Sequence, residues 1–366
     1  MNGDRGIWEW SDRIAPVDVR ARISLGEGNT PLVRSRRLGR AVGIEHLYFK
    51  IETSNPSGSY KDRFATVAVS DLLARGRRRC LATSSGNTGA ALATYCAAAG
   101  IECTIAILET TPRHKLAQML AHGARLLRVR GFGVDSAITH STLEQLARIG
   151  EAHGTPPQIS AFRYSPVGMS GVRTIAYELA ESFVREGRGL DHLFVPAGGG
   201  GLALAVALGF ETLGPADHSA PRIHVVQPEG NDTIASPLRH GSDTARSVDC
   251  TTAISGLQVA SVIDGDAVIR HCRASGGKGY AVSDAMIWET QRRLAREEGI
   301  FCEPAGAVAL AGAIRAAAAG EIEPSASVVC LVTGSGFKDA TSLERMNRDL
   351  NVPTIELDEL ETRLNG

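Results

Sequence analysis

Residues 192–208 read HLFVPAGGGGLALAVAL, and this stretch predicts the fold class of the protein. The segment 192–196 has the composition of a buried strand. Four glycines then lead into the apolar segment 202–208, which we interpret as a helix. A strand joined to a helix by a short glycine-rich turn is half of a βαβ unit. The stretch therefore predicts an α/β protein with a parallel sheet.

The same alternation of short aliphatic runs and alanine-rich amphipathic segments extends along the chain from residue 46. A length of 366 residues is more than twice that of an average domain, so we expect two domains. The sequence contains no long linker, so the domains should contact each other directly. The predicted strands lie near residues 47–51, 80–83, 103–108, 124–129, 192–196 and 327–333, and the predicted helices near 59–75, 88–99, 113–122, 135–152 and 170–186.

The composition excludes several classes of partner. The chain has 39 basic and 40 acidic residues and a net charge of −1, so we expect no binding of nucleic acid or of an anionic membrane. A small-molecule partner is favoured instead. The first residues are charged and contain no apolar run like that of a signal peptide, which favours a cytoplasmic protein. The seven cysteines have no metal-binding spacing, so we expect reduced, mostly buried thiols and no metal site.

Lysine is rare in this chain and occurs only at positions 50, 61, 115, 278 and 338. Unlike an arginine guanidinium, a lysine amine can lose its proton and attack a carbonyl carbon. Lys61 stands in the first turn of a predicted helix, where a positive charge is unfavourable. We interpret Lys61 as a reactive amine. The alternative is a solvated lysine with no chemical role.

The glycine run lies at the carboxyl end of a predicted strand, where open α/β sheets bind their ligands. In Gly198, Gly199, Gly200 and Gly201, the backbone N–H groups can converge on one anion at the start of a helix. This arrangement favours a phosphate group. The alternative is a tight turn that binds nothing.

A second loop of this kind, SSGNT at residues 84–88, precedes the alanine-rich segment 88–99. The hydroxyls of Ser84, Ser85 and Thr88, the amide of Asn87 and the nearby backbone N–H groups suit a carboxylate or a phenolate oxygen. Helix capping without a ligand is the alternative.

Together these segments resemble the fold type II pyridoxal-phosphate enzymes, and among them the threonine synthase family. The resemblance spans nearly the whole chain. It implies a homodimer of two-domain α/β subunits with the cofactor, pyridoxal 5'-phosphate, in the cleft between the domains. The large domain would comprise residues 1–55 and 160–366, and the small domain residues 56–159. The matching segments are GEGNTPL at 26–32, NPSGSYKDR at 55–63, SSGNTG at 84–89, PAGGGGL at 196–202, EPA at 303–305 and TGSGFKD at 333–339.

The resemblance also implies roles for individual residues. Lys61 would bind the cofactor as a Schiff base and later remove the α-proton of the substrate. The glycines 198–201 would bind the cofactor phosphate, Asn87 would face the phenolic oxygen, and Thr333 would meet the pyridine nitrogen. The substrate carboxylate would lie against four residues: Ser84, Ser85, Asn87 and Thr88.

The implied reaction is the elimination of phosphate from O-phospho-L-homoserine, followed by addition of water to give L-threonine. A hydroxyl such as that of Thr333 does not keep the pyridine nitrogen protonated as a carboxylate would, which favours elimination and replacement over transamination or racemisation. A serine or threonine ammonia-lyase and a β-replacement enzyme are the alternatives on the same scaffold. A cofactor-free binding protein is a more remote one.

Two departures from the family pattern concern the substrate phosphate. Gly168 stands where we align an arginine, and Gly199 and Leu202 stand where asparagines are common. Without that arginine a phosphate dianion lacks a bidentate partner, unless Arg163 or Arg63 replaces it. We therefore expect weak discrimination among leaving groups, and we expect an arginine introduced at position 168 to help phosphorylated substrates only.

Overall fold

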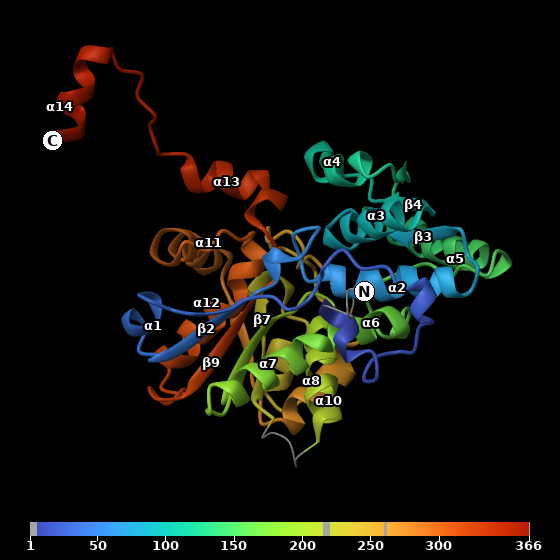
Figure 1. Ribbon diagram of the computed structural model, residues 1–366, viewed down its shortest axis with the longest axis horizontal. Coiled ribbons are helices and arrows are strands. Elements are labelled where there is room, and N and C mark those ends of the chain that lie inside the picture. Colours follow the sequence, from blue (N-terminus) through green and yellow to red (C-terminus); the bar gives the residue numbers. More distant parts are fainter. Residues whose placement is uncertain (1–5, 215–219, 260–261, 366) are drawn as a thin grey trace.

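The computed structural model describes residues 6–214, 220–259 and 262–365, and its strands form two sheets (Figure 1). The larger sheet has six strands in the order β1-β2-β9-β6-β7-β8. Strand β1 is antiparallel to β2, and the other four pairings are parallel. The strands are β1 (Leu32–Arg34), β2 (His46–Ile51), β6 (His192–Pro196), β7 (Arg222–Pro228), β8 (Gly279–Val282) and β9 (Ser327–Val332).

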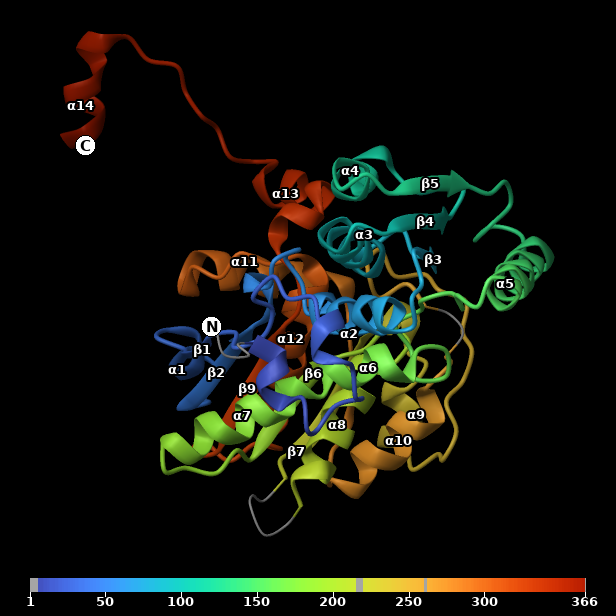
Figure 2. The same ribbon diagram turned by 45° about the vertical axis from the view of Figure 1, so that its right-hand side comes forward.

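The smaller sheet contains three parallel strands, which lie together at one side of the molecule (Figure 2). They alternate with helices, as the sequence predicts for βαβ units. The strands are β3 (Arg79–Thr83), β4 (Glu102–Ile107) and β5 (Arg125–Arg128), and the helices of this part are α3 (Asn87–Ala99), α4 (Arg113–Ala121) and α5 (Ser136–Ala152). The predicted division into domains near residues 55 and 159 stays a prediction.

The central strands of the larger sheet are buried on both faces, because alternate side chains enter different apolar clusters. In β9, Val329 and Leu331 belong to one cluster, whereas Val328, Cys330 and Val332 belong to the other. Helix α12 (Pro304–Ala318) covers the second face. The first cluster also includes side chains from β3 and β4, so one continuous core joins the two sheets.

Helix α2 (Lys61–Ala74) connects the two parts by packing against both α3 and α6 (Pro166–Val172). The single helix predicted near 170–186 is wrong, because the chain forms α6 and α7 (Thr174–Arg185) with a break at Arg173. At this break the Thr174 hydroxyl donates to the Gly171 carbonyl and accepts a bond from Arg63, so side-chain hydrogen bonds interrupt the regular helix.

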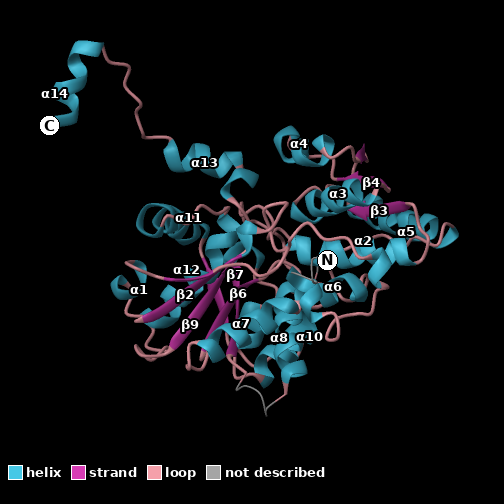
Figure 3. Ribbon diagram, viewed as in Figure 1, coloured by secondary structure: helices cyan, strands magenta, loops and turns pink. Residues whose placement is uncertain are grey.

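The remaining helices surround the larger sheet, except for the last two, which lead away from it toward the C-terminus (Figure 3). The remaining helices are α1 (Leu38–Ala41), α8 (Gly201–Leu213), α9 (Ala235–Arg239), α10 (Gly265–Ala274), α11 (Asp284–Arg293), α13 (Ala340–Asn347) and α14 (Leu360–Asn365). None of the helices in the described ranges has the length and apolar composition needed to cross a membrane.

Candidate active site

A cavity of about 910 Å³ is lined by the loops that follow β2, β3, β6 and β9. Its volume lies within the range that small-molecule sites usually occupy. The structure brings all ten residues that the sequence singled out to this one cavity, although they come from distant parts of the chain. They are Lys61, Ser84, Ser85, Asn87, Thr88, Gly198, Gly199, Gly200, Gly201 and Thr333.

The glycine loop lies between β6 and the N-terminus of α8. Gly200 has φ +90°, and a Cβ atom there would come within 2.7 Å of Val268 and 3.0 Å of Ile234. Only glycine therefore fits this position without strain. The N–H groups of residues 198–201 donate no hydrogen bond to another described residue. These free donors at a helix N-terminus suit a phosphate group.

Lys61 is the first residue of α2, and its position is fixed by the end of β9. The backbone N–H of Tyr60 donates to the Thr333 carbonyl at 3.1 Å, which holds the start of the helix beside that strand. Thr333 is only 4% exposed, yet its hydroxyl has no hydrogen-bond partner among the described residues. A free hydroxyl on a residue that lines the cavity suits a polar ligand atom.

The amine of Lys61 begins a short hydrogen-bonded chain. Its Nζ donates to Ser160 Oγ at 2.6 Å, and that oxygen lies 3.0 Å from Thr88 Oγ1. Sequence reasoning missed Ser160, because no motif surrounds it. The structure brings it there through a single parallel bridge between Gln158 and Ala82 of β3, which places residue 160 near the 84–88 loop that follows the same strand.

Asn87, the first residue of α3, donates from Nδ2 to Glu303 Oε1 at 2.7 Å. Burial raises the pKa of Glu303 to about 7, although the Lys338 charge and the Asn87 hydrogen bond lower it. A Cβ at Gly334 would lie 2.2 Å from Glu303 Oε1, so glycine at that position allows the contact. Sequence reasoning assigned Glu303 no role beyond its motif.

The structure corrects our expectations about arginine. Gly168 lies in α6 against Phe64, where a Cβ atom would come within 2.7 Å of the ring, so neither the space nor the orientation suits an arginine that reaches the cavity. Arg63 is fully buried and bonded to the carboxylates of Glu52 and Glu178. Arg163 is exposed and lies outside the described lining of the cavity. None of these three positions belongs to the described lining of the cavity.

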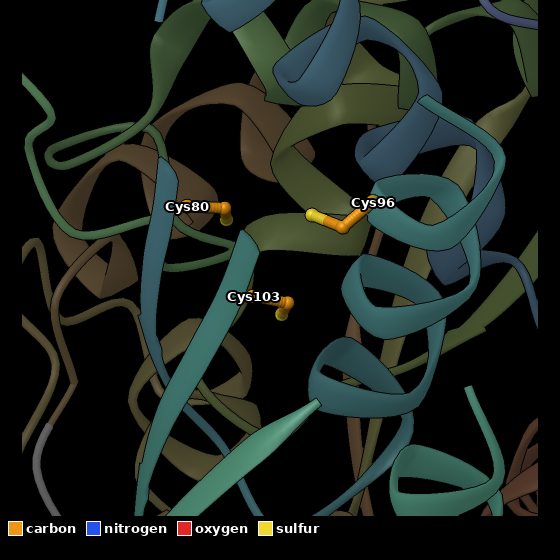
Figure 4. Close-up of side chains that lie close together, drawn as sticks. All are labelled: Cys80, Cys96 and Cys103. Carbon is orange, nitrogen blue, oxygen red and sulfur yellow. The ribbon is translucent and has the colours of Figure 1, made fainter. Parts of the chain in front are cut away.

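Three free cysteines lie together in the smaller part of the molecule, away from the lining of the cavity (Figure 4). Cys80 of β3, Cys96 of α3 and Cys103 of β4 are buried, and their sulfur atoms all lie within 4.8 Å of one another. Their distance along the chain does not reveal this contact. Cys80 and Cys103 are neighbours on paired strands, and the helix brings the third thiol over them.

Comparisons with known proteins agree with the features of the cavity. A family model described as "Pyridoxal-phosphate dependent enzyme" matches residues 23–334. The threonine synthase of Methanocaldococcus jannaschii is 32% identical over 94% of this chain and 83% of its own length. The threonine synthase of Mycobacterium bovis is 34% identical over 95% of this chain and 92% of its own length.

Solved structures show the same architecture. The processed form of threonine deaminase isoform 2 from Solanum lycopersicum has a TM-score of 0.73 and 22% identity, with 96% of each chain covered. A fungal L-serine ammonia-lyase from Rhizomucor miehei has a TM-score of 0.72 and 22% identity and covers 88% of this chain and 98% of its own. With a family match over most of its length and the fold in common, the chain belongs to the pyridoxal-phosphate-dependent enzymes of fold type II and is a lyase with pyridoxal phosphate as its cofactor.

Proposed function

We propose that this protein is a lyase of the threonine synthase type, which converts O-phospho-L-homoserine and water into L-threonine and phosphate. The observation that carries the proposal is the convergence of Lys61, the glycine loop and the 84–88 loop on one cavity. Threonine synthases that are 32% and 34% identical over nearly the whole chain support the choice of reaction.

The described residues fit the cofactor. The glycines 198–201 offer unpaired N–H groups for its phosphate, Thr333 offers a free hydroxyl for its pyridine nitrogen, and Asn87 offers an amide for its phenolic oxygen. The amine of Lys61 would bind its aldehyde. When bound, pyridoxal phosphate supplies an electron sink that stabilises negative charge on the substrate carbon.

The protein then has to hold the amino acid and move protons. The hydroxyls of Ser84, Ser85 and Thr88, together with the N-terminus of α3, suit the α-carboxylate. The Lys61 amine is the group that takes the α-proton. Ser160 and Thr88 hold that amine through the hydrogen-bonded chain, so the base and the carboxylate site have a fixed relative position.

A second candidate is a serine or threonine ammonia-lyase. It is favoured by one observation: no arginine is found among the described residues that line the cavity, so the usual bidentate partner of a phosphate dianion is missing there.

Product analysis separates the two candidates. Purified holoenzyme is incubated with O-phospho-L-homoserine, and phosphate and threonine are measured. Parallel reactions with L-serine and L-threonine are assayed for 2-oxo acid. We expect equal amounts of phosphate and threonine from the first substrate. Formation of 2-oxo acid from serine or threonine, with no threonine from phosphohomoserine, would contradict the proposal. The homodimer also stays a prediction, which light scattering tests.

A further inference from the structure

The few lysines of this chain fall into two groups. Lys50 pairs with Glu178 at 2.6 Å and Lys278 pairs with Glu321 at 3.3 Å. The other three, Lys61, Lys115 and Lys338, all line the cavity. Within the part of the chain that the structure describes, none of these three has a carboxylate within ion-pair distance. Unpaired ammonium groups are therefore concentrated in the cavity.

The cavity has little negative charge of its own to balance them. Glu303 is the one acidic residue among the described residues of its lining, and burial raises its pKa to about 7. Under the proposed function, Lys61 binds the cofactor, the glycine loop binds the cofactor phosphate, and the N-terminus of α3 binds the α-carboxylate. Lys115 and Lys338 then remain without an ion pair to any described carboxylate, although the carboxyls of Glu303 and Asp62 act on Lys338 from beyond ion-pair distance.

These two lysines meet at one helix. Lys115 lies on α4, and its Nζ donates to Ser255 Oγ at 2.5 Å. Lys338 follows β9, and its Nζ donates to Oε1 of Gln118 at 2.8 Å. Gln118 is one helical turn after Lys115, and residues at this spacing are neighbours on a helix surface. Gln118 is itself held by the Ser57 carbonyl at 3.0 Å. Lys338 therefore bonds to the same turn of α4 that carries Lys115, and both side chains line the same cavity.

Both present partners of these lysines are neutral, although each ammonium is partly withdrawn from water. The two carboxyls that act on Lys338 have pKa values raised to about 7 by burial, so they balance its charge only in part near neutral pH. Desolvated positive charge that is not fully balanced is unfavourable, and an anion bound in the cavity beside these ammonium groups would reduce that cost. A dianion suits the site better than a single carboxylate, because two ammonium groups line the same cavity. Ammonium groups also bind phosphate as point charges, so a planar arginine fork is not required.

We propose that Lys115 and Lys338 form the binding site for a doubly charged terminal group, such as phosphate, on the side chain of the amino-acid substrate. This inference rests on the proposed function and adds its specificity-determining residues. It takes the place of Gly168, Arg63 and Arg163, which the structure places elsewhere. Because α4 belongs to the part with the three-stranded sheet and Lys338 follows the six-stranded sheet, a bound anion contacts both parts of the molecule.

Binding of two matched ligands to the holoenzyme tests the site. The first ligand is the phosphonate isostere of O-phospho-L-homoserine, in which a CH₂ group replaces the ester oxygen. The second is L-norvaline, which lacks the terminal anion. The variants are Lys115→Met, Lys338→Met and the corresponding arginine variants. Lys278→Met is the control, because that lysine is exposed and pairs with Glu321 outside the cavity lining. Dissociation constants are measured by calorimetry.

We expect wild-type protein to prefer the phosphonate over norvaline by about 100-fold or more. Each methionine variant should weaken phosphonate binding by about tenfold or more and change norvaline binding by less than about twofold. The arginine variants should keep most of the preference, because they keep the charge. Lys278→Met should match wild type for both ligands.

Two results would overturn the site: equal binding of the two ligands to wild type, or equal weakening of both ligands in the methionine variants. A failure of the proposed reaction looks different. If phosphohomoserine is not converted to threonine while the charge-dependent preference for the phosphonate persists, the reaction is wrong and the anion site is supported.

Discussion

The proposed mechanism assigns both cofactor binding and proton transfer to the amine of Lys61, and replacement of this residue tests both roles. We expect Lys61→Ala to lose turnover and the visible absorbance band of the bound cofactor. The fold should be unaffected, since the change removes one partly exposed side chain from the first turn of a helix and opens no core. Absorbance spectra, activity and thermal unfolding measure these effects. Substantial turnover by the variant would refute the mechanism.

Thr88 tests whether the amino-acid portion is recognised separately from the leaving group. Its hydroxyl lies in the carboxylate loop and contacts Ser160. We expect Thr88→Ala to weaken phosphorylated and neutral amino acids alike, by about 1–3 kcal/mol, because a hydrogen bond to a charged group is lost in both cases. Apparent affinities for O-phospho-L-homoserine and L-serine provide the comparison. A loss confined to one of them would contradict the assignment.

The raised pKa of Glu303 predicts that the stability of the cofactor-free protein depends on pH. Its folded pKa of about 7 lies above the usual value for glutamate, so the native state binds an extra proton between about pH 4.5 and 7. The stabilisation is fully present below this window and is lost as the pH rises through it. Glu303→Gln removes the titration and keeps an acceptor for Asn87.

We therefore expect Glu303→Gln to gain stability relative to wild type as the pH rises from 5 to 8, by up to about 3 kcal/mol. Asp62 has a pKa raised in the same direction by burial, but it is present in both proteins, so its contribution cancels in the difference. Urea unfolding at both pH values measures the effect. If the free energies of unfolding of wild type and Glu303→Gln change in parallel with pH, Glu303 does not titrate in this range.

At the scale of elements, two constraints act on the turn between β6 and α8: a positive φ and close contacts with neighbouring side chains. Two glycine-to-alanine variants separate these constraints. Gly200→Ala places a side chain on a residue with positive φ, and its new Cβ would also lie 2.7 Å from Val268 and 3.0 Å from Ile234. In Gly187→Ala, φ is +62° but nothing lies within 4 Å. We expect about 1 kcal/mol of destabilisation at Gly187 and more than about 2 kcal/mol at Gly200.

The same pair also tests the phosphate cradle. Because the Gly200 turn positions the N–H groups at the start of α8, we expect Gly200→Ala to weaken cofactor binding by about tenfold or more, whereas Gly187→Ala should leave it unchanged. Cofactor titrations measure both. Equal cofactor affinity in the two variants would show that the turn is structural only.

At the scale of the whole molecule, a buried ionic network joins segments that are distant in sequence. Arg63 of α2 bonds to Glu52, which follows β2, and to Glu178 of α7, which also pairs with Lys50 of β2. Burial opposes the ionisation of Glu178, yet the charges of Arg63 and Lys50 outweigh it and lower its pKa to about 2. The buried groups of this network therefore stay ionised, and removal of any one of them leaves a buried charge without its partner.

We expect Arg63→Met to destabilise the protein by about 3–5 kcal/mol, because it leaves two buried carboxylates with one lysine. The control is Arg75→Met at the C-terminal end of the same helix, where a solvent-accessible pair with Asp71 should contribute less than about 1 kcal/mol. Urea unfolding compares them. Similar stability losses in both variants would contradict the role of the network.

Much of the architecture follows from local patterns in the sequence. The strands β2, β3, β4, β5, β6 and β9 lie where alternation of aliphatic and helical segments predicts them, because a buried parallel strand needs a run of apolar residues. Strands β1, β7 and β8 were not predicted. The break at Arg173 was not predicted either, because the Thr174 hydroxyl beside it is hydrogen-bonded to Arg63, which is distant in the sequence.

The sequence by itself determined which loops reach the cavity, because the carboxyl ends of parallel strands meet at one edge and each motif follows such a strand. Only the tertiary structure decided the partners of individual side chains. Ser160 contacts Lys61 across 99 positions, and Gly168 faces Phe64 and not the cavity. The reason is physical: local composition fixes the backbone of each element, whereas the packing of elements against one another fixes which charges and hydroxyls meet.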